Sequence, residues 1–358
     1  MTTKAFASQA DLDEKRVTFE RLSEHGWAYT AEGDPNTGIV IGRDAAMVID
    51  TQATPVMAAD VIRRIREVSA VPIKYVLLSH YHAVRVLGAS AFKAEGLEQV
   101  IASDATLALI RERGEQDKAS EIGRFPRLFR NVESVPPGLT WPTLTFSGRL
   151  TLDLGGVKVE MFSPGRGHTA GDTVAWLPEE RVLFSGDLVE FDATPYCGDA
   201  HFADWPATLD AIAALKAEAL VPGRGPALKG AAQVAAGLDG TRAFVSELFA
   251  AVQAGVQAGE ELKAVYQRTM AALRPTYGHW VIFDHCMPFD VTRAYDEAGG
   301  TAHPRIWTAE RDLEMWKALE GAREPWSCPV IPTGKAWSSA AASRSAIRSS
   351  SSVPGPWA

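Results

Sequence analysis

Four residues of metal-binding types stand where predicted strands end. His80 and His82, separated by one residue, follow an apolar strand segment, and His168 stands in a glycine-rich turn. Asp187 ends a second apolar segment further along the chain. Neutral imidazoles together with one carboxylate suit Zn²⁺, Fe²⁺ or Mn²⁺. The residue types and their spacing therefore predict a site for one divalent metal, with zinc as the first choice and iron or manganese as alternatives.

Each of these patterns alone also has a purely structural explanation. A His-x-His pair occurs by chance, and a histidine at a strand end is more often a polar cap than a ligand. Their joint order along one chain favours a shared site, because catalytic groups often lie where the strands of a sheet open into loops.

Strands and helices alternate in the segments that must position these side chains. Residues 46–50 and 73–80 are expected to be strands, and 57–70 has apolar residues at helical spacing. The nearly continuous apolar run in 73–80 is typical of a strand buried on both faces. A strand over 98–103 and a helix over 104–116 are predicted to follow.

The rest of the chain changes character twice. Residues 117–148 have no clear period, and we expect an irregular insertion there, lying as a lid on the substrate side. Short strands return from residue 149, and 229–274 predicts helices with a break near 255–259. The Ser- and Ala-rich end of the chain, from residue 332, has the composition of a disordered tail.

Composition excludes several classes of protein. The chain has 358 residues, of which 46% are hydrophobic and 22% charged, as in a soluble globular protein. Its 36 Lys and Arg against 44 Asp and Glu give a net charge of −8, so the basic footprint of a nucleic-acid-binding protein is absent. The longest apolar runs are far shorter than the ~20 residues of a membrane helix. The N-terminus has no apolar core of signal-peptide length.

The three cysteines are widely spaced and predict no disulfide framework. We therefore expect a cytoplasmic protein whose partner is a small molecule, with neither nucleic acid nor membrane as a partner.

Four ordered motifs in this chain resemble those of the metallo-β-lactamase superfamily. That family has HxHxDH after a buried strand, then a Gly-His-Thr turn, a Ser/Thr-Gly-Asp strand end and a PGHG turn. The matching segments are SHYHAVR (79–85), GRGHTAGD (165–172), LFSGDLV (183–189) and VPGRGP (221–226). An upstream strand that ends at Asp50 and Thr51 matches a further family motif. The resemblance implies an α/β fold, the αββα sandwich of this family, here with a C-terminal helical extension.

On this resemblance the chain divides into segments of different kinds. They are a flexible N-terminus (1–16), a metallo-β-lactamase-like domain (17–230), a helical accessory region (231–331) and a disordered tail (332–358).

The resemblance assigns the ligands of one metal completely. The three histidine positions of the family's first metal site are His80, His82 and His168, and Asp187 matches the carboxylate that bridges two metals in the family.

The second metal site of the family is degenerate here. Its three ligand positions hold Val84, Arg85 and Arg224. Valine has no donor atom, and arginine stays protonated and accepts no bond. We therefore expect mononuclear chemistry.

Arg85 and Arg224 have two interpretations. As catalytic residues beside Asp187, they would replace the positive charge of the lost metal, stabilise an oxyanion and bind an anionic substrate. As structural residues, they would pair with Asp187 or with Glu190 and Asp192.

Further residues are candidates for substrate contacts: Tyr81, His201, His279 and His285. The alternative for the two histidines of the aromatic segment 277–286 is helix packing or the surface of a homodimer.

Three functions follow from these observations. The first is metal-dependent hydrolysis of a small-molecule ester, lactone or related acyl bond by water acidified on zinc. Valine at position 84 removes the family's proton acceptor, which leaves Asp187 for that role. The second is oxygenation by iron held in a His-and-carboxylate triad. The third is a non-catalytic binding or regulatory protein on the same fold.

Overall fold

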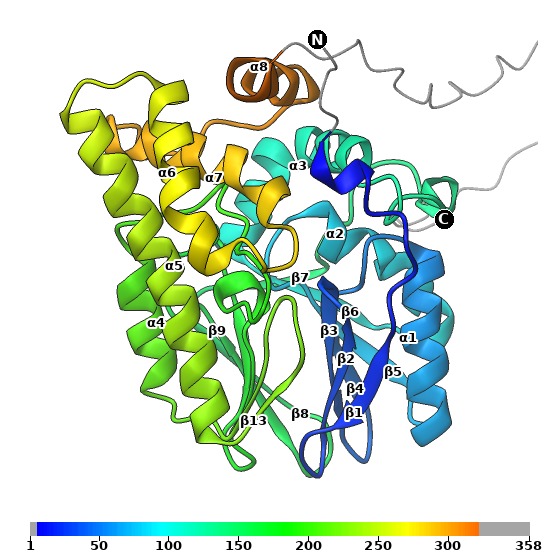
Figure 1. Ribbon diagram of the computed structural model, residues 1–358. Coiled ribbons are helices and arrows are strands. Elements are labelled where there is room, and N and C mark those ends of the chain that lie inside the picture. Colours follow the sequence, from blue (N-terminus) through cyan, green and yellow to red (C-terminus); the bar gives the residue numbers. More distant parts are fainter. Residues whose placement is uncertain (1–5, 322–358) are drawn as a thin grey trace, which may run out of the picture. The chain divides into compact units, whose positions relative to one another are not determined.

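The computed structural model describes residues 6–321, which belong to one compact unit (Figure 1). The predicted tail at 332–358 and the end of the predicted helical region lie outside the described residues. None of the helices in the described part is long and apolar enough to cross a membrane.

Residues 6–321 contain two β-sheets, each covered on its outer side by helices (Figure 1). The strands of the seven-stranded sheet, in spatial order, are β1 (Thr18–Arg21), β2 (Gly26–Ala31), β3 (Asp34–Ile41), β4 (Ala46–Ile49), β5 (Ile73–Leu77), β6 (Gln99–Ser103) and β7 (Leu144–Phe146). The strands of the six-stranded sheet are β13 (Leu228–Lys229), β12 (Ala219–Val221), β11 (Val182–Phe184), β10 (Val174–Leu177), β9 (Lys158–Phe162) and β8 (Arg149–Asp153).

Strands β4 to β7 are parallel neighbours, and β11 runs parallel to β12; the other pairs are antiparallel. The α-helices are α1 (Pro55–Val68), α2 (Ala83–Val86), α3 (Asp104–Arg124), α4 (Trp205–Ala213), α5 (Ala231–Gln257), α6 (Leu262–Tyr277), α7 (Phe283–Ala298) and α8 (Ala309–Glu320). Short 3₁₀ helices lie at η1 (Ala7–Gln9), η2 (Leu87–Glu95), η3 (Val132–Ser134) and η4 (Gly186–Leu188).

Strand β4 shows why the sheet needs cover on both faces. Successive side chains of a strand point to opposite faces. Met47 and Ile49 belong to the apolar cluster between the two sheets, whereas Val48 belongs to the cluster that packs against Val61 and Ile65 of α1. The continuous apolar pattern is thus buried on both sides, and the predicted αββα sandwich is confirmed.

The two sheets approach each other closely between β3 and β11. A Cβ atom at Gly38 would lie 2.2 Å from Cδ1 of Phe184, and Phe184 is 1% exposed. A glycine is therefore needed at position 38 for this aromatic ring to fill the space between the sheets.

The expectation for residues 117–148 is wrong in part. Helix α3 continues to Arg124 rather than ending near residue 116, and β7 adds a strand at 144–146. From Arg113 onward the buried face of α3 carries charged side chains, so the apolar period that marks a helix is lost. Between β5 and β6, residues Leu87–Glu95 form a 3₁₀ helix rather than an α-helix.

Part of the N-terminal segment that was predicted to be flexible packs on the core. Phe6 is 1% exposed, and its ring lies 4.6 Å from that of Trp316 in α8. At the C-terminal end of the described chain, α5, α6, α7 and α8 form the predicted helical extension, with the expected break after Gln257.

Candidate metal centre

The turn that carries the first two histidines is held by the end of the neighbouring strand. The backbone N–H of Ser79 donates to Oδ1 of Asp50 at 2.8 Å, and the Ser79 hydroxyl donates to Oδ2 at 2.7 Å. Because Asp50 follows β4 and Ser79 follows β5, these bonds fix where the chain leaves the sheet. His80 and His82 follow immediately.

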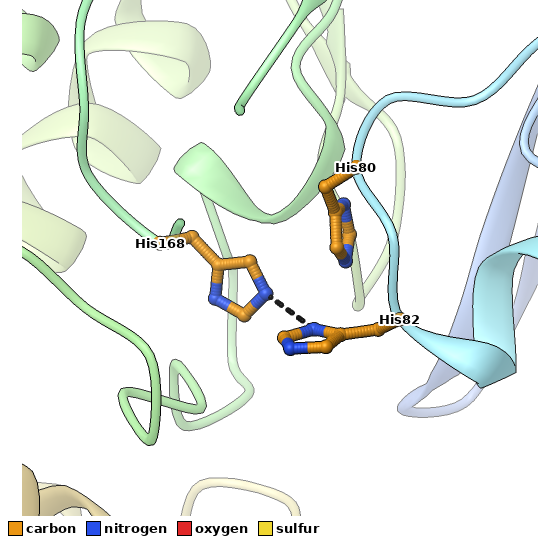
Figure 2. A group of neighbouring side chains, drawn as sticks. All are labelled: His80, His82 and His168. Atoms are coloured by element: carbon orange, nitrogen blue, oxygen red, sulfur yellow. Dashed lines mark hydrogen bonds between the residues drawn. The ribbon is translucent and has the colours of Figure 1, made fainter. Parts of the chain in front are cut away.

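Three imidazoles converge on one point (Figure 2). Each of His80, His82 and His168 offers one nitrogen, and these nitrogens all lie within 4.8 Å of one another. Nε2 of His168 and Nδ1 of His82 are 3.0 Å apart. All three side chains are at most 2% exposed. The chain segments around residues 80 and 168 are far apart in sequence and meet only because both sheets open at the same end.

For His80 and His168, the outward ring nitrogen is held by an acceptor, which turns the other nitrogen inward. Nδ1 of His80 lies 2.9 Å from the Ser79 hydroxyl, whose own proton goes to Asp50, so the imidazole N–H donates. Nδ1 of His168 donates to the carbonyl of Tyr196 at 2.8 Å. Nε2 of both rings is therefore the lone-pair nitrogen that a metal would use.

His82 is oriented by two carboxylates on its outer side. Its Nε2 lies 3.3 Å from Oδ2 of Asp199 and 4.0 Å from Oδ1 of Asp117. Asp199 also accepts from the Tyr81 hydroxyl at 2.8 Å and from Arg113 at 2.6 Å. A hydrogen bond from Nε2 leaves Nδ1 of His82 for the ligand, and such outer partners raise the basicity of a ligating imidazole.

Burial and charge act differently on the three imidazoles. Burial lowers the pKa of His80 well below its usual range and that of His168 to about 3, so both are neutral. Burial also lowers the pKa of His82, but the charges of Asp117 and Asp199 outweigh it and raise that pKa to about 9. A metal bound at this nitrogen would take the place of a proton.

Asp187 lies beside the triad and between two arginines. Its Oδ2 is 3.7 Å from Nε2 of His80 and 3.6 Å from Nε2 of His168. Burial would raise the pKa of Asp187, but the positive charges, with Arg85 the largest, hold it far below its usual range. The carboxylate is therefore ionised and is available as an acceptor, not as an acid.

Arg85 is directed into the protein rather than toward a ligand. It is 1% exposed, forms an ion pair with Asp187, and donates to the carbonyls of Asn36 at 3.1 Å and Gly223 at 2.9 Å. These contacts join α2, β3 and the loop after β12, as the structural interpretation of this residue requires.

Arg224 differs from Arg85 because it lines the cavity beside the histidines. Its Nη1 lies 3.4 Å from Oδ2 of Asp187 and 3.5 Å from Oε1 of Glu190, distances that leave the guanidinium only loosely bound. Burial, together with the charge of Asp187, raises the pKa of Glu190 to about 8.

A small cavity of about 10 Å³, roughly the space of one water molecule, adjoins the triad. Helix α7 supplies one wall and helix α3 another. The lining residues are His82, Val84, Glu121, Phe125, His168, Asp187, Tyr196, Arg224, Ile282, His285 and Cys286. The lining thus combines aromatic rings with a few polar groups.

Of the four predicted substrate contacts, the structure brings His285 to the cavity. This side chain is 1% exposed, its ring lies 4.4 Å from that of Phe125, and among the described residues neither ring nitrogen has a hydrogen-bond partner. Burial lowers the pKa of His285 well below its usual range, so the imidazole is neutral.

The other three candidates lie elsewhere. Tyr81 is buried behind His82 and donates to Asp199, and the backbone N–H of His201 donates to the carbonyl of Gly167 at 2.8 Å. His279 is exposed on the surface after α6. These placements follow from tertiary packing, since residue type alone cannot tell an outer partner from a lining residue.

Sequence reasoning missed three acidic side chains near the triad: Asp117, Glu121 and Asp199. Asp117 and Glu121 are one helical turn apart on α3. The signal that would have found them is the i, i+4 spacing of two acids in a segment that continues a predicted helix.

Comparison with known proteins agrees with this architecture. The family model described as metallo-beta-lactamase superfamily matches residues 30–224, more than half of the chain. A metallo-beta-lactamase type 2 from Bacteroides fragilis is 26% identical over 225 residues, which are 61% of this chain and 79% of that protein. The enzyme of the same name from Bacillus cereus is 23% identical over 206 residues, 55% of this chain and 71% of that protein.

Solved structures agree at the level of the fold. A metallo-beta-lactamase from Pontibacter korlensis superimposes with a TM-score of 0.51 at 23% identity. The match covers 64% of this chain and 99% of that protein, so the sandwich is common to both and the C-terminal helices are largely additional here.

Proposed function

The chain belongs to the metallo-β-lactamase superfamily, and from this membership we propose that it is a hydrolase that uses one divalent metal to cleave a small-molecule ester, lactone or related acyl bond. The relatives are metallo-β-lactamases, which are hydrolytic enzymes. Zinc is the proposed metal, because three imidazole nitrogens suit its preferred coordination. When bound, such a metal supplies an acidified water and polarises the carbonyl of the substrate.

The observation that supports the proposal most strongly is the set of outer partners. Ser79, Tyr196 and Asp199 each contact the outward nitrogen of one histidine, so the inward nitrogens of all three rings are directed at one shared point. A buried ligand nitrogen such as Nε2 of His80 has no hydrogen-bond partner among the described residues, as expected for a metal ligand.

We propose an anionic substrate on the basis of Arg224. Its guanidinium lines the cavity and is held by two contacts longer than 3.3 Å, so a carboxylate could compete for it. Arg85, whose two Nη atoms are engaged inside the protein, is proposed to hold Asp187 in place rather than to touch the substrate.

The proposal is tested by metal content and by a substrate panel. The chain is purified without added metal, and metal per chain is measured together with hydrolysis of small esters, lactones, thioesters and amides. About one zinc per chain with hydrolysis supports the hydrolase. About one iron with uptake of O₂ would support an oxygenase instead. Less than a tenth of a metal ion per chain, with no activity after metal is added back, would favour a non-catalytic binding protein.

The variant Arg224→His tests whether Arg224 binds an anionic substrate or merely stands where the family has a ligand of its second metal. On the anion-binding proposal, Arg224→His raises KM for acids more than for neutral analogues and binds no second metal. Two metals per chain and a higher kcat would show that Arg224 has no catalytic function and only replaces a metal ligand of the family.

A further inference from the structure

Hydrolysis at this site, as proposed above, needs a group that accepts the proton of the attacking water. The position at which the family has an aspartate holds Val84, which lines the cavity but has no acid–base group. The proton acceptor must therefore come from another element of the fold.

Asp187, the carboxylate nearest the imidazoles, is ionised, and two arginines balance its charge. Asp187 forms ion pairs through both oxygens, Oδ1 with Arg85 and Oδ2 with Arg224. Each oxygen of Asp187 thus faces a guanidinium group, which leaves neither of them free to take up a proton. Asp187 is therefore better suited to orienting groups than to removing a proton, which differs from its expected role in catalysis.

The carboxylates behind His82 are also engaged, and they do not line the cavity. Asp199 accepts bonds from Tyr81 and Arg113 besides its contact with His82. Asp117 accepts from the backbone N–H of residue 83 at 2.7 Å.

Glu190 is likewise excluded by its position. It accepts from the backbone N–H of Arg224 and is not among the residues that line the cavity.

Glu121 is the remaining carboxylate, and it lines the cavity from α3. It is 4% exposed. Its Oε1 accepts from Arg124 at 2.9 Å, while Oε2 is buried without a hydrogen-bond partner among the described residues. A buried carboxylate oxygen with no donor is unfavourable unless a ligand or substrate water supplies one.

We propose that Glu121 is a catalytic residue, the proton acceptor that replaces the aspartate lost at position 84. The oxygen of the attacking water forms a bond to the acyl carbon, and its proton passes to Oε2 of Glu121. The bond from the acyl carbon to the leaving group then breaks, and the proton passes from Glu121 to the leaving oxygen, sulfur or nitrogen. The products are the acid and the protonated leaving group, and Glu121 is again a carboxylate.

Arg124 gives the carboxylate a defined orientation. It lies one turn further along α3, is 1% exposed, and donates to Oε1 of Glu121 and, at 3.3 Å, to the Tyr196 hydroxyl. With Oε1 occupied, Oε2 is the oxygen left for a proton. The i, i+3 spacing on a helix keeps the pair together without help from a loop.

The test compares Glu121→Gln with Glu115→Gln, an exposed glutamate on the same helix. In Glu121→Gln the amide oxygen still accepts from Arg124, so the fold and the metal are retained, but no proton can be taken up. The expected result is a kcat lower by about 10²–10⁴-fold with KM changed little, the typical contribution of a general base. Metal per chain and the melting temperature stay at their wild-type values, and Glu115→Gln behaves as wild type.

A second variant, Glu121→Ala, tests for rescue of kcat by an added carboxylate, which is not expected if Glu121 is only a structural residue. Added formate, a small carboxylate, is expected to restore part of kcat in Glu121→Ala and to leave Glu115→Gln unaffected. The proposal is overturned if Glu121→Gln keeps more than about a tenth of wild-type kcat, or if either Glu121 variant loses its metal. Failure of the proposed function can be distinguished from failure of the Glu121 proposal, because in the former case the wild-type chain itself would hydrolyse none of the acyl substrates.

Discussion

Replacing Arg85 by methionine should destabilise the protein severely, because it removes the main counter-charge of a buried carboxylate. Arg85 is 1% exposed, pairs with Asp187 and donates to two buried carbonyls at 3.1 and 2.9 Å. In Arg85→Met, Asp187 keeps Arg224, at 3.4 Å, as its arginine partner, beside the neutral rings of His80 and His168. Breaking a buried ion pair by removing one partner costs about 3–5 kcal/mol.

The magnitude is measured as the free energy of unfolding of the metal-free chain in urea. A loss of about 4 kcal/mol corresponds to roughly a thousandfold shift toward the unfolded state. The matched control is Arg63→Met on α1, whose side chain is 55% exposed although it also contacts two carboxylates, Asp60 and Glu67. An exposed arginine of this kind contributes about 1 kcal/mol or less.

The double variant Arg85→Met/Asp187→Asn separates the lost charge pair from lost packing. Removing both charges should restore about 1–3 kcal/mol relative to the sum of the single changes, as expected for residues in contact. If Arg85→Met costs less than about 1 kcal/mol, or if the two changes are additive, Arg85 is not the structural counter-charge of Asp187, and a direct role toward the substrate would have to be considered again.

Three further changes test other parts of the structure. His168→Ala removes one of three convergent nitrogens, and metal per chain after dialysis should fall below about a tenth of the wild-type value; retention of a full equivalent would contradict the triad. Asp199→Asn should weaken metal binding about 10–100-fold in a chelator competition, because a ligand loses its outer partner, and an unchanged affinity would refute that role. Gly38→Ala should cost about 1–3 kcal/mol through overlap with Phe184, whereas Gly240→Ala in α5, with its nearest atom at 3.9 Å, should be neutral or stabilising.

Much of the fold could be predicted from local patterns. The apolar period of 57–70 and the buried pattern of 73–80 correspond to α1 and β5, whose ends differ from the expectation by a few residues. The error at 117–148 has a physical reason: the buried face of α3 there carries Asp117, Glu121 and Arg124, which are paired inside the protein. A hydrophobic pattern cannot reveal a helix whose buried face is charged.

Among the site residues, the sequence by itself predicted the three histidines that converge in the structure, and the resemblance to the family predicted the loss of the second set of ligands. Those inferences depend on residue type and order along the chain, which are local properties. The sequence could not assign Arg85 and Arg224, which have the same chemistry and the same motif origin. Only the structure distinguishes them, because Arg224 lines the cavity and Arg85 does not.

The tertiary structure alone decided which groups surround the triad. His82 meets Asp199, 117 residues away along the chain, and Glu121 reaches the cavity from a helix that no family motif includes. Burial and pairing are properties of the folded chain, and they determine which carboxylate is neutralised and which keeps a free oxygen. A sequence therefore specifies the available donors and acids, whereas the packing of two sheets and their helices decides which of them can exchange a proton beside the metal centre.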